Sequence, residues 1–121
     1  MLTVENVTLD SFAIEAKEVD GRLCLTLTGT ADMAAHNVLR HSLGVVRSDV
    51  ERLGLSQVQI DIRALYLLNS SCIKALLRLV YLAQTEHPSF SIEFLVDPNL
   101  SWQARALAPL KRLAPELVRV T

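Results

Sequence analysis

A short strand followed closely by an uninterrupted helix, within residues 57–84, constrains the fold more than any other feature of the sequence. Alternating apolar and polar residues predict a half-buried strand over about 57–63. A second apolar stretch at 65–68 follows, and 72–84 contain neither glycine nor proline. Asn69 is well suited to cap a helix that begins there. Such a unit is typical of α/β folds, in which helices pack on the sheet that the strands form.

The N-terminal part of the chain predicts a β-hairpin. Residues 12–19 and 23–28 both alternate apolar and polar side chains, and Asp20-Gly21 between them is a two-residue turn signal. We therefore expect two antiparallel strands. Residues 1–11 have no clear period and are expected to form an arm or a short edge strand before a domain that spans 12–121.

The segment after the hairpin predicts a helix. Thr30 or Asp32 can cap its start, and Gly54 is expected to end it. Its apolar positions are spaced alternately by four and three residues, which places them on one helical face. They are Leu39, Leu43, Val46, Val50 and Leu53.

The C-terminal part predicts a strand, a helix and a last strand. Residues 91–96 are rich in β-formers, and 117–120 form a short apolar run. The helix is expected over 102–113, capped by Ser101 and kinked or divided at Pro109. The complete order is β-β-α-β-α-β-α-β, an α/β domain with a mixed sheet, an opening antiparallel hairpin and helical crossovers.

Composition narrows the classes of function. The chain has 121 residues, of which 50% are hydrophobic, so it is long enough for one domain with its own core. A net charge of −1 favours neither nucleic acid nor a membrane as partner. Cys24 and Cys72 form no CxxC pair, which suits a reducing compartment and predicts a cytoplasmic location. His36, His41 and His87 lack metal-ligand spacing, so we expect no metal. The four glycines form neither GxGxxG nor a Walker sequence, and we expect no cofactor.

The helix after Asn69 has one narrow polar strip. On a helical wheel, Ser70, Ser71, Lys74 and Arg78 lie within an arc of about 100°. A helix N-terminus accommodates an anion, and a phosphate on either serine would carry about −1.5 to −2 charges there. The alternative interpretation is that Asn69 and the two serines merely begin the helix.

Two stretches of the sequence carry a family resemblance. In VQIDIRALYLLNSSCIKALLRL, an apolar strand and an apolar pair lead to Asn-Ser-Ser-Cys at a helix start, and in LTGTADMAAHNVLRHSL a strand leads through Gly–x–x–Asp into a helix. Both stretches resemble the STAS domain, the fold of bacterial anti-sigma factor antagonists, whose signature has Asp-Ser-Ser-Gly at the helix start of the first stretch. The resemblance covers about residues 12–120 and looks nearest to small stand-alone STAS-like regulators. Asn69 replaces the family's acid, and Cys72 replaces its glycine.

The resemblance implies a bacterial regulator that binds partner proteins and is switched by phosphorylation. The phosphorylated position of the family corresponds to Ser70, with Ser71 as the alternative. The implied partners are a serine kinase of the anti-sigma type, a serine phosphatase and a downstream regulator. The partner-binding residues are expected to be Asp32, Asn69, Ser70, Ser71, Lys74 and Arg78.

Other functions are weighed against this interpretation. Catalysis by Ser70 would need an activating base, and neither a GxSxG elbow nor an SxxK set with its companion motifs is present, so we do not expect an enzyme. The alternative function is a constitutive STAS-like scaffold or interaction subunit that is not phosphorylated. Cys24 and Cys72 are expected to be buried and unreactive, and Trp102 to be a half-buried anchor.

Overall fold

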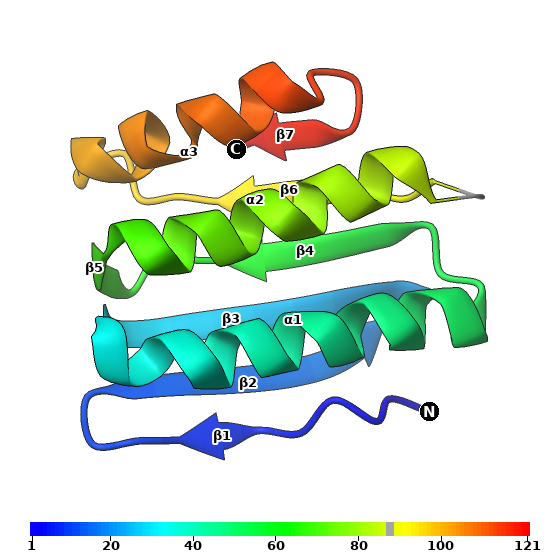
Figure 1. Cartoon of the computed structure of the whole chain (residues 1–121), viewed down its shortest axis with the longest axis horizontal. Coiled ribbons are helices and arrows are strands. Elements are labelled where there is room, and N and C mark those ends of the chain that lie inside the picture. Colours follow the sequence, from blue (N-terminus) through cyan, green and yellow to red (C-terminus); the bar gives the residue numbers. More distant parts are fainter. Residues whose placement is uncertain (87–88) are drawn as a thin grey trace.

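The computed structural model describes residues 1–86 and 89–121, which form a seven-stranded mixed sheet and three helices (Figure 1). This confirms the predicted α/β class with its opening hairpin and helical crossovers. The elements are β1 (Val7–Thr8), β2 (Phe12–Val19), β3 (Arg22–Ala31), α1 (Met33–Leu53), β4 (Gln57–Asp61), β5 (Leu65–Leu68), α2 (Ser70–Thr85), β6 (Ser91–Leu95), α3 (Ser101–Leu113) and β7 (Val118–Val120).

The sheet has the strand order β1-β2-β3-β4-β6-β7, and β5 pairs separately with β3. β1, β2 and β3 are antiparallel neighbours, whereas β3, β4, β6 and β7 run parallel. Parallel neighbours need crossovers, and such crossovers are right-handed. Because each crossover steps across the sheet in the same direction, α1, α2 and α3 lie on the same face, where α2 contacts both other helices.

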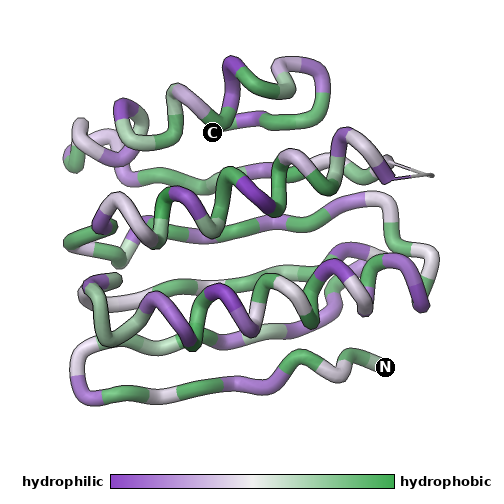
Figure 2. The backbone as a smooth tube through the Cα atoms, in the orientation of Figure 1, coloured by the Kyte–Doolittle hydropathy of each residue, from purple (hydrophilic) through white to green (hydrophobic). Residues whose placement is uncertain are grey.

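The core lies between this helical layer and the sheet. Leu25, Ile60 and Phe94, from three adjacent strands, are fully buried there. The alternate residues of the same strands face the opposite side, where the Gln59 amide donates a hydrogen bond of 3.0 Å to Glu93. Figure 2 shows the resulting alternation of hydropathy along the strands. The protein is thus a two-layer α/β structure whose sheet has one helix-covered face and one polar face.

The predicted turn at Asp20-Gly21 is confirmed. Both residues have positive φ, 52° and 76°, which is the conformation of a two-residue turn of type I′. The turn sets a register in which Val19 pairs with Arg22 and, at the far end, Phe12 pairs with Gly29.

Strand β5 was not predicted from the sequence, in which its residues formed only an apolar stretch. It pairs in parallel with the last three residues of β3, and the register shifts between the first two of them, Gly29 and Thr30. Gly29 has a φ of 91°, and a Cβ atom there would lie 2.2 Å from the carbonyl oxygen of Ser11. Glycine is therefore required at the residue where the pairing of β3 with β2 ends and its pairing with β5 begins.

The starts of α1 and α2 confirm the predicted caps at Asp32 and Asn69. Asp32 accepts hydrogen bonds from the amides of Ala34 and Ala35, and Asn69 accepts one from the amide of Cys72. Gly54 follows the last residue of α1, as predicted.

The expectations for α3 were partly wrong. Leu100, not Ser101, is the cap residue, and it makes no side-chain cap hydrogen bond. The helix is not divided at Pro109. Proline removes the hydrogen bond to the carbonyl four residues earlier, at Arg105. Both residues are exposed, so water can satisfy that carbonyl and the helix continues.

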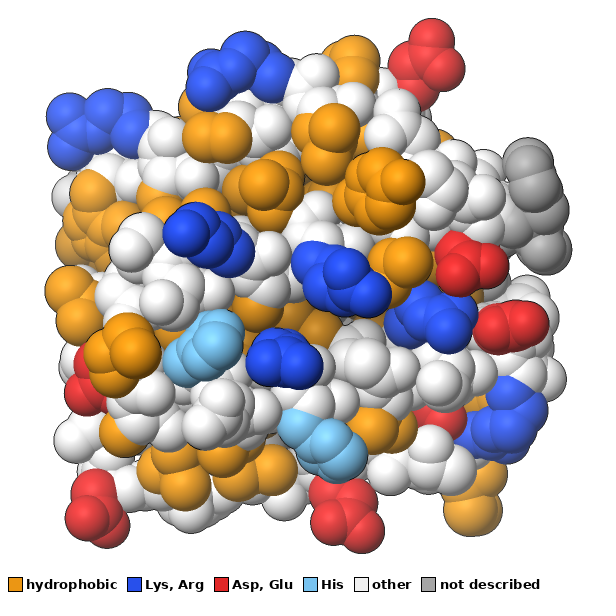
Figure 3. All heavy atoms as spheres, viewed as in Figure 1, with side chains coloured by type: hydrophobic (Ala, Val, Ile, Leu, Met, Phe, Trp, Pro, Cys, Tyr) orange, Lys and Arg blue, Asp and Glu red, His pale blue; other side chains and the backbone are white. Residues whose placement is uncertain are grey.

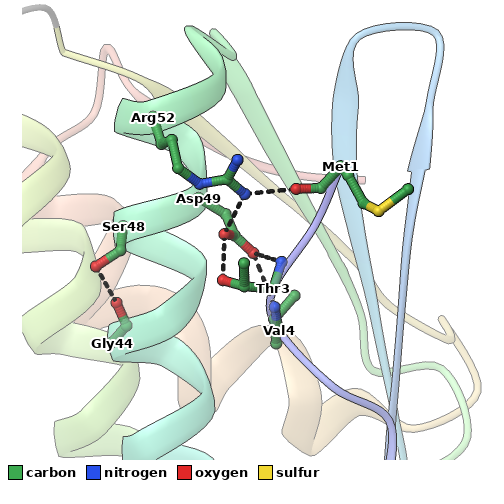
Figure 4. A network of polar contacts seen from close by, with 7 residues as sticks. All are labelled: Met1, Thr3, Val4, Gly44, Ser48, Asp49 and Arg52. Atoms are coloured by element: carbon green, nitrogen blue, oxygen red, sulfur yellow. Dashed lines mark hydrogen bonds and ion pairs between the residues drawn. The ribbon is translucent and has the colours of Figure 1, made fainter.

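The N-terminal segment is tied to α1 by Asp49 (Figure 4). The Asp49 carboxylate accepts hydrogen bonds from the Thr3 amide (2.8 Å), the Val4 amide (2.9 Å) and the Thr3 hydroxyl (2.6 Å). Arg52 pairs with the same carboxylate at 2.9 Å and also donates to the carbonyl of Met1. Residues before β1 therefore pack on the helical layer, and β1 forms the edge of the sheet.

Candidate partner-binding site

The sheet brings the N-termini of α1 and α2 together at one end of the molecule. β3 ends at Ala31 and β5 at Leu68, which are paired in register, and each strand leads directly into a helix. The amide of Asn69 donates to the carbonyl of Ala31 at 2.9 Å. The Cys72 thiol lies 3.6 Å from the carbonyl oxygen of Asp32. The two helix starts are thus held side by side.

Ser70 and Ser71 have different environments in this arrangement. Ser70 is the first residue of α2 and is exposed. Ser71 is half-buried, and its hydroxyl lies 3.7 Å from the sulfur of Met33 on α1. The Asn69 amide oxygen caps the helix through the Cys72 amide, so the hydroxyl of Ser70 is not needed for the cap. Of the two predicted positions, Ser70 is the more accessible.

Asp32 and Cys72 have structural roles beside the serines. The Asp32 carboxylate is half-buried and caps α1. Cys72 is fully buried, and burial raises the pKa of its thiol, to which the nearby Asp32 carboxylate adds. The thiol therefore stays protonated, as expected for an unreactive structural cysteine. Cys24 is also buried, which agrees with the sequence prediction.

Exposed apolar side chains lie at the same end of the molecule as the two serines, and sequence reasoning did not identify them. Met33 is 67% exposed, Tyr66 69% and Leu67 46%. The run of four apolar residues in β5 could have indicated this exposure, because a short strand at the end of the sheet cannot bury all four side chains. We name this region the serine surface: Asp32, Met33, Tyr66, Leu67, Asn69, Ser70 and Ser71.

A buried glutamine from α3 holds the chain that leads into the serine surface. Gln103 is fully buried, and its amide nitrogen donates to the carbonyls of Ile62 (2.7 Å) and Leu65 (3.0 Å). Its amide oxygen accepts from the Asp97 amide at 2.8 Å. These bonds fix the chain that enters β5. No local pattern in the sequence indicates this role of Gln103.

The other two predicted residues lie apart from the serine surface. Lys74 and Arg78 follow at successive turns of α2, are exposed, and line a groove against α1. His36 and Arg40 of α1 line the opposite wall. The six predicted partner-binding residues therefore divide between the end of the sheet and the space between two helices.

The described residues contain neither a group of metal-ligand side chains nor a membrane-spanning helix. Within residues 1–86 and 89–121, no three His, Cys, Asp or Glu side chains are grouped so as to hold a metal ion. His87 lies outside the described residues. In the part of the chain that the structure describes, no helix is long and apolar enough to span a membrane. Trp102 is half-buried against the core, as predicted.

Comparison with solved structures agrees with this architecture. The chain has a STAS-like fold, which confirms the fold that the sequence resemblance implied. It is similar to a crystal structure of an anti-sigma factor antagonist from Mycobacterium paratuberculosis, with a TM-score of 0.69 and 19% identity, over 93% of this chain and 88% of that one. No family profile and no curated protein matches the sequence. At this identity the likeness shows the fold.

Proposed function

We propose that the protein is a non-enzymatic regulatory module that binds a partner protein through the serine surface, and that phosphorylation of Ser70 switches this binding. The observation that carries the proposal is the position of Ser70, exposed at a helix N-terminus and next to Ser71, whose hydroxyl contacts the exposed Met33. Exposed apolar residues grouped together are typical of protein interaction sites. The similarity to an anti-sigma factor antagonist supports a regulatory role.

The helix start favours a phosphate on Ser70. The first amide groups of α2 have no acceptor within the helix, and the helix dipole places partial positive charge there. Lys74 is one turn further along the same face and is exposed. A phosphate can therefore be accommodated without disturbing the fold, because its charge is met by groups already present.

The same phosphate opposes association with a partner. It would add about −1.5 to −2 charges next to Met33 and the apolar residues of β5. A partner that buries those side chains would have to remove water from the phosphate, which is unfavourable without compensating donors. Phosphorylation thus weakens or redirects binding. The implied partners are a serine kinase of the anti-sigma type, a serine phosphatase and a downstream regulator, in the bacterial cytoplasm.

The experiment uses the partner captured from native cells by the wild-type protein. The intact mass of the recovered protein shows whether a phosphate is present and fragmentation assigns it. Calorimetry then compares the protein before and after phosphatase treatment. We expect phosphorylation to weaken binding by about 1–3 kcal/mol, a factor of roughly 5 to 150. Equal affinities of the two forms would contradict the switch.

Variants separate the serine from general charge effects. Ser70→Ala should retain binding, and Ser70→Asp should weaken it. Ser48→Asp is the matched control, because Ser48 is an exposed helical serine near the other end of α1. Phosphate found on Ser71 alone would keep the mechanism and move the site by one residue.

A second candidate function is a constitutive scaffold that uses the same surface without modification. The observation that favours it is Asn69, which keeps the helix cap through its amide oxygen but lacks the charge of the acid that the resembled family has there. Under this function the protein from native cells carries no phosphate and still binds its partner. If the missing acid limits phosphorylation, Asn69→Asp raises the rate at which the captured kinase modifies Ser70.

A further inference from the structure

A groove between α1 and α2 combines basic walls with an apolar floor. Its walls carry His36 and Arg40 from α1 and Lys74 and Arg78 from α2, and its floor includes Leu43 and Leu79. The groove has a volume of about 340 Å³. We name it the basic groove. In Figure 3, Lys, Arg and His side chains gather over the two helices in front, with hydrophobic atoms between them.

The basic side chains form two rows. His36 and Arg40 are four residues apart on α1, and Lys74 and Arg78 are four residues apart on α2, so each pair spans one helical turn, about 6 Å. Lys74 and Arg78 are like charges, which at this spacing destabilise a helix. No Asp or Glu is among the residues that line the groove.

The basic side chains of the groove lack the acidic partners that a neighbouring arginine of α1 has. Arg47, further along α1, pairs with Glu51 and with Glu86. Among the residues that the structure describes, the ion pairs involve Arg47, Arg52 and Arg63, and none involves a side chain of the basic groove. The acidic side chains seen in Figure 3 lie around the margin of this face. The groove therefore presents positive charge without an internal counterpart.

We propose that the basic groove binds an acidic amphipathic helix of a partner protein. The apolar strip of such a helix lies along Leu43 and Leu79, and carboxylates on its two flanks face the two basic rows. Charge complementarity argues for this occupant, because the groove has basic side chains on both walls and apolar side chains between them. A bilayer surface would not enter a concave site, and nucleic acid would leave the apolar floor uncovered.

The proposal does not depend on phosphorylation of Ser70. Arg40, His36 and the floor of the groove are not part of the serine surface. Failure of the groove to bind leaves the proposed switch intact, and an unphosphorylated Ser70 leaves the groove intact. The tests below therefore use the unphosphorylated full chain.

The probe is a synthetic capped peptide of about 14 residues, long enough for roughly four turns. It carries leucines on one face and glutamates on both flanks, and its control replaces every glutamate with glutamine. Fluorescence anisotropy measures binding, and backbone amide NMR shifts locate it. We expect the acidic peptide to bind with shifts confined to α1 and α2, to weaken as salt increases, and to bind more tightly than the neutral peptide.

Charge reversal tests the walls. Arg40→Glu with Arg78→Glu should weaken binding of the acidic peptide by about tenfold or more, since two favourable charges become repulsive. The matched control is Arg105→Glu with Arg112→Glu, two exposed arginines of α3 that give the same net charge. Equal losses in both double variants would overturn the proposal, because the effect would then come from net charge alone.

A larger side chain in the groove tests whether the peptide binds along its apolar floor. This test is independent of whether the charge-reversal variants fold. A Cβ atom on Gly44, which also lines the groove, would meet nothing within 4 Å. Gly44→Met should therefore fold and reduce peptide binding by about fivefold or more, whereas Gly44→Ala should bind like the wild type. Unchanged binding to Gly44→Met would overturn the proposal. Tighter binding of anionic vesicles or of a single-stranded oligonucleotide than of the peptide, through the same arginines, would overturn it as well.

Discussion

Two buried polar side chains each fix a segment of the chain that lies far away in the sequence. Asp49 receives the N-terminal segment, and Gln103 receives the chain that enters β5. Among the described residues, no buried polar side-chain atom lacks a hydrogen-bond partner. Each of these residues therefore satisfies several groups at once, so its loss would leave more than one donor or acceptor unpaired.

We expect Asp49 to make the free energy of unfolding depend on pH in the acidic range. Its burial alone would raise the pKa, but hydrogen bonds from Thr3, Val4 and Arg52 outweigh burial and lower the pKa from 3.8 to about 2. A carboxyl whose pKa is lower in the folded state stabilises above the unfolded value, and that contribution is lost as the pH falls from about 4 towards 2. The difference corresponds to about 2 kcal/mol at neutral pH.

Denaturant unfolding of wild type and Asp49→Asn measures this contribution. We expect Asp49→Asn to lower the free energy of unfolding by about 2 kcal/mol at pH 7, and by much less near pH 2. Asp10→Asn, at an exposed carboxylate, is the control and should have little effect. A difference that stays constant between pH 7 and pH 2 would show that the Asp49 charge does not contribute.

Cys72 should be unreactive in the folded protein. Its side chain is fully buried and its pKa is raised, so little thiolate is available to a disulfide reagent. A Cys24→Ser variant isolates its reaction. We expect Ellman's reagent to modify Cys72 at the rate of global unfolding in buffer, and at once in guanidinium. Rapid modification under native conditions would contradict the buried position of this thiol.

Two glycines within elements of the fold have opposite requirements for space. Gly29 has positive φ and no room for a side chain, whereas Gly44 lies inside α1 with open space around it. Gly29 allows β3 to end its pairing with β2 and to begin its pairing with β5. Gly44 only reduces the helix propensity of α1.

Alanine at each glycine should therefore have opposite effects. Gly29→Ala should destabilise the protein by at least about 2 kcal/mol, since it strains the backbone and clashes with Ser11. Gly44→Ala should stabilise it by about 0.5–1 kcal/mol. Thermal and denaturant unfolding of both variants measure the two shifts. A neutral Gly29→Ala would mean that the segment at Ser11 moves away at little cost.

Elements with a local signal could be predicted from the sequence, and those stabilised by distant contacts could not. The hairpin turn at 20–21 and the caps at Asp32 and Asn69 depend on neighbouring residues, and all three are confirmed. Strand β5 exists because it pairs with the end of β3, which no local pattern reveals. The uncapped start of α3 follows from its tertiary position, where Gln103 anchors the first turn.

The candidate site was predictable to the same degree. The position of Ser70 at the start of α2 followed from the cap signal at Asn69. The apolar neighbours did not, because the exposure of Met33 and Tyr66 depends on how two strand ends are placed together. The basic groove likewise pairs residues of α1 and α2 that are more than 30 positions apart, and helix packing brings them together.

In the whole molecule, one end of the sheet serves as a platform that all three helices support. α1 and α2 begin there, and α3 reaches the same end through Gln103. Gln103 is buried and does not belong to the serine surface. Its hydrogen bonds hold the chain just before Tyr66 and Leu67, so the geometry of the exposed surface depends on a buried residue of a third helix.

Gln103→Leu should therefore loosen the serine surface without altering any residue in it. The change keeps the size of the side chain but removes its hydrogen bonds to two carbonyls and to the Asp97 amide, although the Ile62 carbonyl keeps the Leu65 amide as a donor. It should cost about 2–3 kcal/mol of stability. Hydrogen exchange should accelerate most over 62–69 and at Asp97, while the paired centres of β3 and β4 stay protected. Gln84→Leu is the matched control, since Gln84 is an exposed glutamine with one hydrogen bond, to Leu113. Uniform acceleration across the sheet would mean that Gln103 stabilises the fold as a whole and does not specifically position β5.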